Sequence, residues 1–214
     1  MEKQIACRCC GKCCLDGGPA LHQQDLEILR EGVLSLDKLI TIRQGELVRV
    51  PFQKELKPAA TELVKISGRQ QDWTCVYFDR EQGCTIYQAR PFACRALKCW
   101  DMDELLAIVE KETLTRFDIL PENDPLLPWM REHELACSCS ELRFFLEDGS
   151  LPEELRPLFE QKVRDDLRIR QHIVSRYHIR LEEELFRFGR PLFQQLAALG
   201  VRFSESINGL KILW

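Results

Sequence analysis

The sequence predicts an α+β protein, in which a small N-terminal module of short strands and turns packs on a helix-rich C-terminal half. Three observations predict this class. Short β-rich segments separated by glycine and proline occupy the N-terminal part of the chain. Apolar residues at helical spacing dominate after Trp100. Alternating apolar residues around the pair Asn208-Gly209 predict a terminal β-hairpin.

The N-terminal half contains two predicted helices and several predicted strands. We expect a short helix at residues 25–30, and a second one at residues 87–97 with Pro91 in its first turn. The segments rich in β-forming residues, and therefore predicted as short strands, are residues 46–51, 62–66 and 73–78.

The C-terminal half has clearer helix signals. Asp101 and Glu104 resemble a helix cap, and Pro152 with Glu153 marks the start of one or two long helices. Their apolar stripe consists of Leu155, Phe159, Val163, Leu167, Ile173, Tyr177, Leu181 and Leu185. Pro191 and Gly200 bracket a last short helix. We place a boundary near residue 100, between residues 1–100 and 101–214, with one continuous domain as the alternative.

Composition excludes several classes of protein. Of the 214 residues, 45% are hydrophobic and 30% are charged, as in an ordinary globular chain. The net charge of −4 argues against a generic nucleic-acid binder or a polybasic membrane binder. The N-terminus lacks an apolar signal region, and no run approaches 18 apolar residues. We therefore predict a cytoplasmic protein with neither a nucleic-acid nor a membrane partner.

Eleven cysteines are the abnormal feature of the composition. In a reducing compartment, clustered thiols indicate metal binding or catalysis more often than disulfides. Five of them fall in the segment Cys7-Arg-Cys9-Cys10-Gly-Lys-Cys13-Cys14, where Cys7, Cys10 and Cys13 have C-x2-C-x2-C spacing. Two intervening residues let a tight loop turn its sulfurs onto one ion, as in zinc sites and the bacterial ferredoxin run. Gly11 suits the sharp turn that such a loop needs.

A second cluster consists of Cys75, Cys84, Cys94 and Cys99. Its spacings match no common zinc-finger template and are weak as a signal alone. Together with the first cluster they supply eight thiols, enough for two four-cysteine sites or one polynuclear site. The N-terminal module is therefore predicted to be stapled by metal.

The two motifs together resemble those of the bacterial YkgJ-like cysteine-cluster family, which is described as zinc- or iron-chelating. The matching residues are Cys7-x-x-Cys10-Gly-x-Cys13-Cys14 and Cys84-Thr-Ile-Tyr-x-x-Arg90-Pro91-x-x-Cys94-Arg95. The resemblance covers roughly residues 5–100. It implies eight metal ligands: Cys7, Cys10, Cys13, Cys14, Cys75, Cys84, Cys94 and Cys99. Cys9 is extra to the family pattern. Flagellin lysine N-methylases resemble this family too, which implies an enzyme as an alternative, although this chain has no methyltransferase glycine loop.

Arg90 and Arg95 flank the second cluster and are candidate cofactor-binding residues. Their positive charge would compensate thiolates, since a four-thiolate zinc site or an oxidised four-iron cluster carries a net charge of about −2. A helix cap or a surface salt bridge is the alternative for both.

His133-Glu-Leu-Ala-Cys137-Ser-Cys139 begins like the H-E-x-x-H helix of zinc enzymes, but Cys137 stands where the second histidine belongs. A separate metal site, participation in the main cluster and two ordinary thiols at a helix end all remain open. His172 and His178 are six residues apart and fall on different helix faces, and His22 is isolated.

The sequence predicts a metal-binding protein that holds zinc or an iron–sulfur centre. One alternative is an iron–sulfur enzyme, an oxidoreductase or a group-transfer enzyme. Another is a thiol redox sensor, in which the adjacent pairs Cys9-Cys10 or Cys13-Cys14 are oxidised. Among the motifs of other enzyme classes, the P-loop, the dinucleotide fingerprint and the G-x-S-x-G elbow are absent from the sequence.

Overall fold

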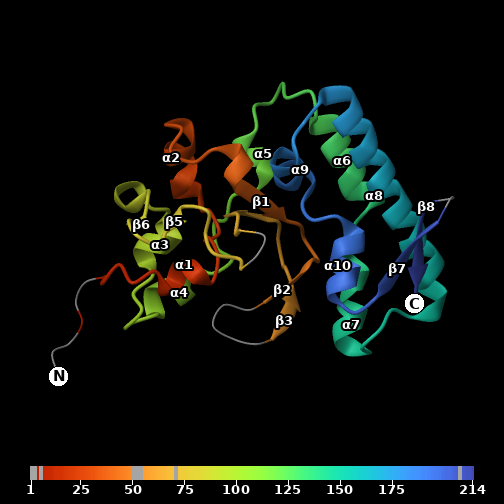
Figure 1. The fold of residues 1–214 in the computed structure, drawn as a ribbon, viewed down its shortest axis with the longest axis horizontal. Helices are drawn as coiled ribbons and strands as arrows, with labels where there is room; N and C mark the ends of the chain where they lie inside the picture. Colours follow the sequence, from red (N-terminus) through yellow and green to blue (C-terminus); the bar gives the residue numbers. More distant parts are fainter. Residues whose placement is uncertain (1–3, 5–6, 50–54, 70–71, 207–208) are drawn as a thin grey trace.

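A computed structural model describes residues 4, 7–49, 55–69, 72–206 and 209–214. Figure 1 shows the elements of the N-terminal part, in red to yellow, at one end of the molecule and the long C-terminal helices, in cyan and blue, at the other. Short antiparallel strand pairs combined with helices confirm the α+β class.

The strands form antiparallel pairs, of which the described residues contain four. The pairs are β1 (Leu39–Ile42) with β4 (Leu63–Ile66), β2 (Leu47–Arg49) with β3 (Leu56–Pro58), β5 (Phe78–Asp79) with β6 (Gly83–Cys84), and β7 (Arg202–Ser206) with β8 (Gly209–Leu213). In the first pair Leu39 lies opposite Ile66. The last pair is the predicted hairpin, and the two residues 207 and 208 between its strands lie outside the described part.

Short helices connect the strands of the N-terminal part. They are α1 (Lys12–Leu15), η1 (Gln23–Asp25), α2 (Leu26–Arg30), η2 (Leu36–Lys38), η3 (Tyr87–Ala89), α3 (Phe92–Ala96) and α4 (Asp103–Ile108). The helix predicted at residues 25–30 is confirmed by η1 and α2. Asp101 Oδ1 accepts a hydrogen bond from the Asp103 amide at the start of α4, but no capping box forms there.

Helices of three to 22 residues build the C-terminal part. They are α5 (Arg116–Ile119), α6 (Leu127–Ala136), η4 (Ser140–Arg143), α7 (Phe144–Glu147), η5 (Glu153–Leu155), α8 (Arg156–Tyr177), α9 (Leu181–Phe188) and α10 (Leu192–Ala198). The predicted apolar stripe runs from η5 through α8 into α9. The helix breaks after Tyr177 because His178 adopts the left-handed conformation, with φ 53°.

Two predicted elements differ from the structure. Residues 87–97 do not form one helix, since η3 ends before Arg90, whose extended conformation (ψ 141°) the following proline favours. Residues 73–78 turn rather than extend, because Trp73 has φ 58°, and only Phe78 belongs to a strand. The structure also contains β1, whose four residues are all buried and therefore lack the alternating pattern that reveals a strand.

Buried apolar side chains form two clusters, which we call the first core and the second core. The first core includes Leu21, Leu39, Val64, Cys75, Phe78, Leu114, Met130, Ile173 and Phe186. The second includes Leu47, Cys137, Cys139, Leu142, Phe159, Leu192, Leu196 and Ile212. The first core thus contains residues from both sides of position 100. The domain boundary near residue 100 stays a prediction.

Within the described residues, none of the helices has the combination of length and apolar composition that crossing a bilayer requires.

Candidate metal centre

The first cysteine motif is a loop that leads into the one-turn helix α1. Gly11 precedes α1 with φ 74°, and its carbonyl oxygen accepts the amides of Cys14 at 2.8 Å and Leu15 at 3.0 Å. A Cβ on Gly11 would lie 2.2 Å from Cζ of Phe78. The loop therefore needs glycine both for its backbone conformation and for the close approach of the Phe78 ring.

Backbone hydrogen bonds tie the second cluster to this loop. The Cys75 amide donates to the Cys14 carbonyl oxygen at 2.7 Å. Phe78, three residues after Cys75, pairs with Cys84 in the β5–β6 ladder. The pairing holds Cys84 near Cys75 although the two are nine residues apart in sequence. Cys75, Cys84 and the α1 loop are thus fixed relative to each other by main-chain contacts.

Cys94 reaches the group through α3, whose first turn is held by a buried carboxylate. Asp25 has no exposed surface, and its Oδ1 accepts the Phe92 amide at 2.7 Å while Oδ2 accepts the His22 amide at 2.9 Å. The contact satisfies one of the free amides at the start of α3. Asp25 was not among the predicted site residues, because it lies far from the cysteines in sequence and in no motif.

The sulfurs of Cys13, Cys14, Cys75, Cys84 and Cys94 lie close enough for their charges to interact, and we call them the thiol group. The pKa of Cys94 is raised to about 12, chiefly by burial and then by the charges on Cys75, Cys13 and Cys84. Burial likewise raises the pKa of Cys75, to which Cys84 and Cys13 add. Thiolates gathered in this way repel each other, and a metal cation among them removes that repulsion.

Cys13 and Cys14 form the closest described pair in the thiol group, with 3.9 Å between their sulfurs. Two thiolates that share one tetrahedral zinc at 2.3 Å lie about 3.8 Å apart, so this spacing fits a common ion. The hydrogen bond between the two thiols lowers the pKa of Cys13 and raises that of Cys14. One of the two is therefore predisposed to be the thiolate that metals bind.

The remaining predicted ligands lie at the edge of the thiol group. Cys7, Cys10 and Cys99 are exposed. The Cys7 sulfur accepts the Cys9 amide at 3.3 Å, and the Cys99 sulfur accepts the Gln4 side-chain amide at 3.6 Å. No three sulfurs of these eight cysteines lie within 4.8 Å of one another in the described part of the chain. For all eight sulfurs to bind one metal centre, the exposed side chains of Cys7, Cys10 and Cys99 would have to turn toward the thiol group.

The two candidate cofactor-binding arginines differ in position. The Arg90 guanidinium stacks 3.7 Å above the centre of the Tyr87 ring. Its charge adds to the lowering of the Cys13 pKa by the Cys14 hydrogen bond, and it partly opposes the rise in the pKa of Cys94 that burial causes. Its Nε is buried without a hydrogen-bond partner among the described residues. Arg95 instead donates from its Nη1 to the Arg90 carbonyl oxygen at 2.6 Å, so it acts on the Arg90 main chain.

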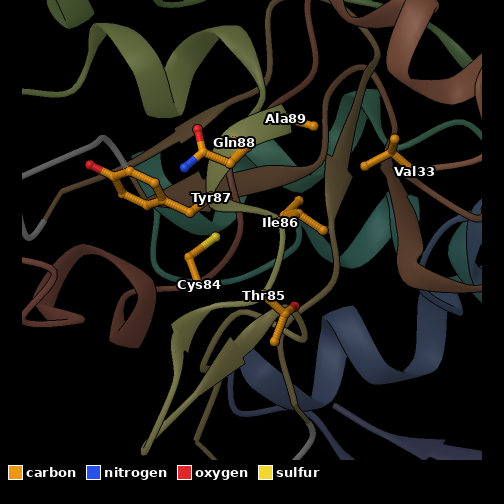
Figure 2. Close-up of a pocket in the computed structure, with 7 residues that line it drawn as sticks. All are labelled: Val33, Cys84, Thr85, Ile86, Tyr87, Gln88 and Ala89. Atoms are coloured by element: carbon orange, nitrogen blue, oxygen red, sulfur yellow. The ribbon is translucent and has the colours of Figure 1, made fainter.

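A hollow of about 430 Å³ lies beside Cys84. Its lining residues are Val33, Cys84, Thr85, Ile86, Tyr87, Gln88 and Ala89. In Figure 2, Cys84 and Tyr87 lie on one side of the 84–89 segment, and Val33 lies on the opposite side.

Cys137 and Cys139 do not belong to the thiol group. Both are fully buried in the second core, where the Cys137 sulfur contacts the Lys162 carbonyl oxygen at 3.6 Å and the Cys139 sulfur contacts Gln195 Oε1 at 3.8 Å. Cys137 is the residue at the end of α6, as expected of a helix-end thiol.

The turns and short strand pairs around the thiol group are typical of small metal-chelating modules, in which sulfur ligands replace part of a hydrophobic core. Residues 6–118, more than half of the chain, match the CxxCxxCC family, described as "Putative zinc- or iron-chelating domain". The chain belongs to this family, which confirms the resemblance seen in the sequence and indicates chelation of zinc or iron. No curated protein and no solved structure matches the chain.

Proposed function

We propose that this protein binds zinc or an iron–sulfur centre through eight cysteine thiolates, in the cytoplasm, where thiols stay reduced. The ligands are Cys7, Cys10, Cys13, Cys14, Cys75, Cys84, Cys94 and Cys99. The observation that supports the proposal is the thiol group. Main-chain contacts fix Cys14, Cys75 and Cys84 relative to each other, and Asp25 holds the helix that carries Cys94.

The charges around the thiol group support the same proposal. Arg90 is a cation that acts on two of its sulfurs, Cys13 and Cys94, and the buried Nε of Arg90 has no partner among the described residues. Cations of this kind beside a metal centre tune ligand basicity and the charge of the site. Metal ligation would contribute folding free energy on the order of 10 kcal/mol if the ion is structural zinc.

Elemental analysis of anaerobically purified protein tests the proposal. Stoichiometric zinc in colourless protein, or iron with sulfide and absorbance near 400 nm, is the expected outcome, and the two results distinguish the ions. Protein that folds with neither metal contradicts the proposal.

Two variants identify the ligands. Cys94→Ser should lower metal content and melting temperature together, because it removes one sulfur of the thiol group. Cys9→Ser is the matched control: it removes a thiol of the same loop that is extra to the family pattern, and both quantities should stay unchanged. Equal losses in the two variants would show that the ligand assignment is wrong.

An iron–sulfur enzyme is the second candidate function, favoured by the hollow beside Cys84. A small substrate bound there would lie next to a proposed metal ligand and against apolar side chains of Val33 and Ile86. Redox-active protein with iron, whose visible spectrum changes when a reductant is added, would support this candidate, whereas colourless zinc protein would exclude it.

A thiol redox sensor is the remaining candidate, favoured by the 3.9 Å contact between the sulfurs of Cys13 and Cys14. Metal-free folded protein in which one disulfide forms and breaks reversibly would support the sensor, and the mass of the alkylated protein measures that disulfide.

A further inference from the structure

A second group of metal-ligand side chains lies where α6 and α8 pack together. His133 and Cys137 are four residues apart and lie on one face of α6 and its C-terminal end, and Asp166 lies on α8. One ring nitrogen, the thiol sulfur and one carboxylate oxygen all lie within 4.8 Å of one another, and all three residues are fully buried. This is the only such group of three that the described residues contain.

Two residues of this group, His133 and Cys137, have an atom without a close hydrogen-bond partner among the described residues. His133 Nε2 contacts Asp166 Oδ1 at 2.6 Å, whereas Nδ1 is buried without a partner among the described residues. A proton on Nδ1 would be an unpaired buried N–H, so the imidazole holds its proton on Nε2 and keeps a free lone pair on Nδ1. The Cys137 thiol makes only a long contact with the Lys162 carbonyl oxygen. The free Nδ1 lone pair can therefore accept the ring proton when a cation binds Nε2, and the buried thiol is available as a second ligand.

The charges around the group are largely paired. Ion pairs, and the charge of Asp166 on Arg43, link a largely buried network of Arg43, Arg116, Arg170, Arg190, Glu46, Glu62, Glu134, Asp166 and Glu184. The Lys65 ammonium acts on Glu46 of the same network, so its five cations and five carboxylates balance. Two neighbouring ion pairs, Lys162 with Glu141 and Arg187 with Asp124, are each neutral.

We propose that His133, Cys137 and Asp166 bind one zinc ion in the interior of the C-terminal half. Binding releases the Cys137 proton to solvent, and the ring proton of His133 moves from Nε2 to Nδ1, so the imidazole stays neutral. The Cys137 thiolate and the Asp166 carboxylate together match the two charges of the ion. Thiolate and imidazole ligands select zinc over magnesium or calcium, which prefer oxygen ligands.

The ion takes the place of the proton between His133 Nε2 and Asp166 Oδ1. Nitrogen and oxygen ligands of one tetrahedral zinc lie about 3.3 Å apart, farther than the present 2.6 Å. Asp166 Oδ1 also accepts a hydrogen bond from Arg170 Nε at 2.7 Å. Asp166 and Arg170 each have a second contact that does not involve Oδ1. Asp166 Oδ2 accepts the Leu192 amide at 2.8 Å, and Arg170 Nη1 donates to Glu184 at 2.7 Å. Asp166 and Arg170 therefore stay anchored when the ion enters.

This site is independent of the proposed thiolate centre. All three residues lie outside residues 6–118, which match the family, and Cys137 lies in the second core rather than the first. No histidine is among the eight proposed ligands of the thiolate centre. A histidine signal that responds to zinc therefore reports on the new site alone.

The test starts from the full chain, stripped of metal anaerobically and reloaded with zinc chloride. Wild-type protein should bind one equivalent of zinc more than Cys137→Ser. The matched control is Cys139→Ser, which removes an equally buried thiol of the second core and should retain the wild-type amount. Equal zinc content in wild type and Cys137→Ser overturns the proposal.

A measurement on wild-type protein guards against a variant that fails to fold. In the ¹⁵N spectrum of the histidine rings, zinc should shift the nitrogens of one of the four histidines, and the assigned signal should be His133. Ring signals that stay unchanged on saturation with zinc would show that the group is only a hydrogen-bonded network and would overturn the proposal.

Discussion

At the scale of single residues, the proposed metal centre depends on a glycine that combines two roles. Gly11 lies in the left-handed region with φ 74°, and the Phe78 ring of the first core fills the space where its side chain would be. An L residue loses free energy of about 1–2 kcal/mol in that conformation even where space is available. At Gly11 the loss of packing against Phe78 adds to this cost.

We therefore expect Gly11→Ala to lower the free energy of unfolding by more than about 2 kcal/mol. Urea unfolding followed by circular dichroism measures the change. Gly32→Ala is the matched control, because Gly32 has φ 75° but no atom within 4 Å of the added Cβ. It should lose only the conformational part. A loss in Gly11→Ala no larger than in Gly32→Ala would show that the approach of Phe78 does not matter.

Arg90 permits a second test at this scale. The charge of its guanidinium, stacked on Tyr87, favours the thiolates: it helps to lower the pKa of Cys13 and partly opposes the rise that burial causes in the pKa of Cys94. Arg90→Gln should weaken metal retention on the order of tenfold, as changes to residues around a metal's ligands do. Competition with a chromophoric chelator measures the affinity. Arg80→Gln removes the same charge from an exposed position and should leave retention unchanged.

At the scale of elements, packing decided what the sequence pattern could not. The long helix, the last short helix and the terminal hairpin were predictable because each has one buried face, which leaves a period in the sequence. Strand β1 has no such period, since all four of its residues are buried. The break between η3 and α3 follows a local rule, the restriction of the residue before Pro91, which periodicity alone does not include.

The same distinction applies to the site. Cysteine spacing is local information and predicted the candidate ligands. Asp25 and Phe78 position those cysteines through contacts across long stretches of chain, which the motif does not record. Likewise, the pairing of His133 with Asp166 joins two helices, so only the α6 half of that group was visible in the sequence.

Helix α3 provides the prediction at this scale. Asp25→Asn retains the size of the side chain but turns one acceptor into a donor that faces an amide. We expect a loss of about 1–3 kcal/mol in the free energy of unfolding, together with reduced metal content, because α3 holds Cys94. Chemical unfolding and elemental analysis measure the two effects. Asp148→Asn, at an exposed position, should change neither, and a similar loss there would remove the special role of Asp25.

At the scale of the whole molecule, the two cores should respond differently to the metal. Cys75 and Phe78 belong to the first core and Cys14 packs against it, whereas the second core contains none of the eight proposed ligands. Metal ligation is folding free energy for the elements that carry the ligands. Regions of one chain can open separately when their local stability differs.

We therefore expect a chelator to accelerate amide hydrogen exchange in α1, β5, β6 and α3 by at least tenfold, while α8, α10 and the β7–β8 hairpin keep their protection. The reason is that loss of the ion removes the ligand bonds that hold the N-terminal elements together, whereas the second core keeps all of its apolar contacts. Mass spectrometry of peptic fragments measures exchange along the chain. The same chelator added to Cys94→Ser should have a smaller effect, because that variant has already lost a ligand. Acceleration spread equally over all helices would instead mean that the 214 residues open as one cooperative unit.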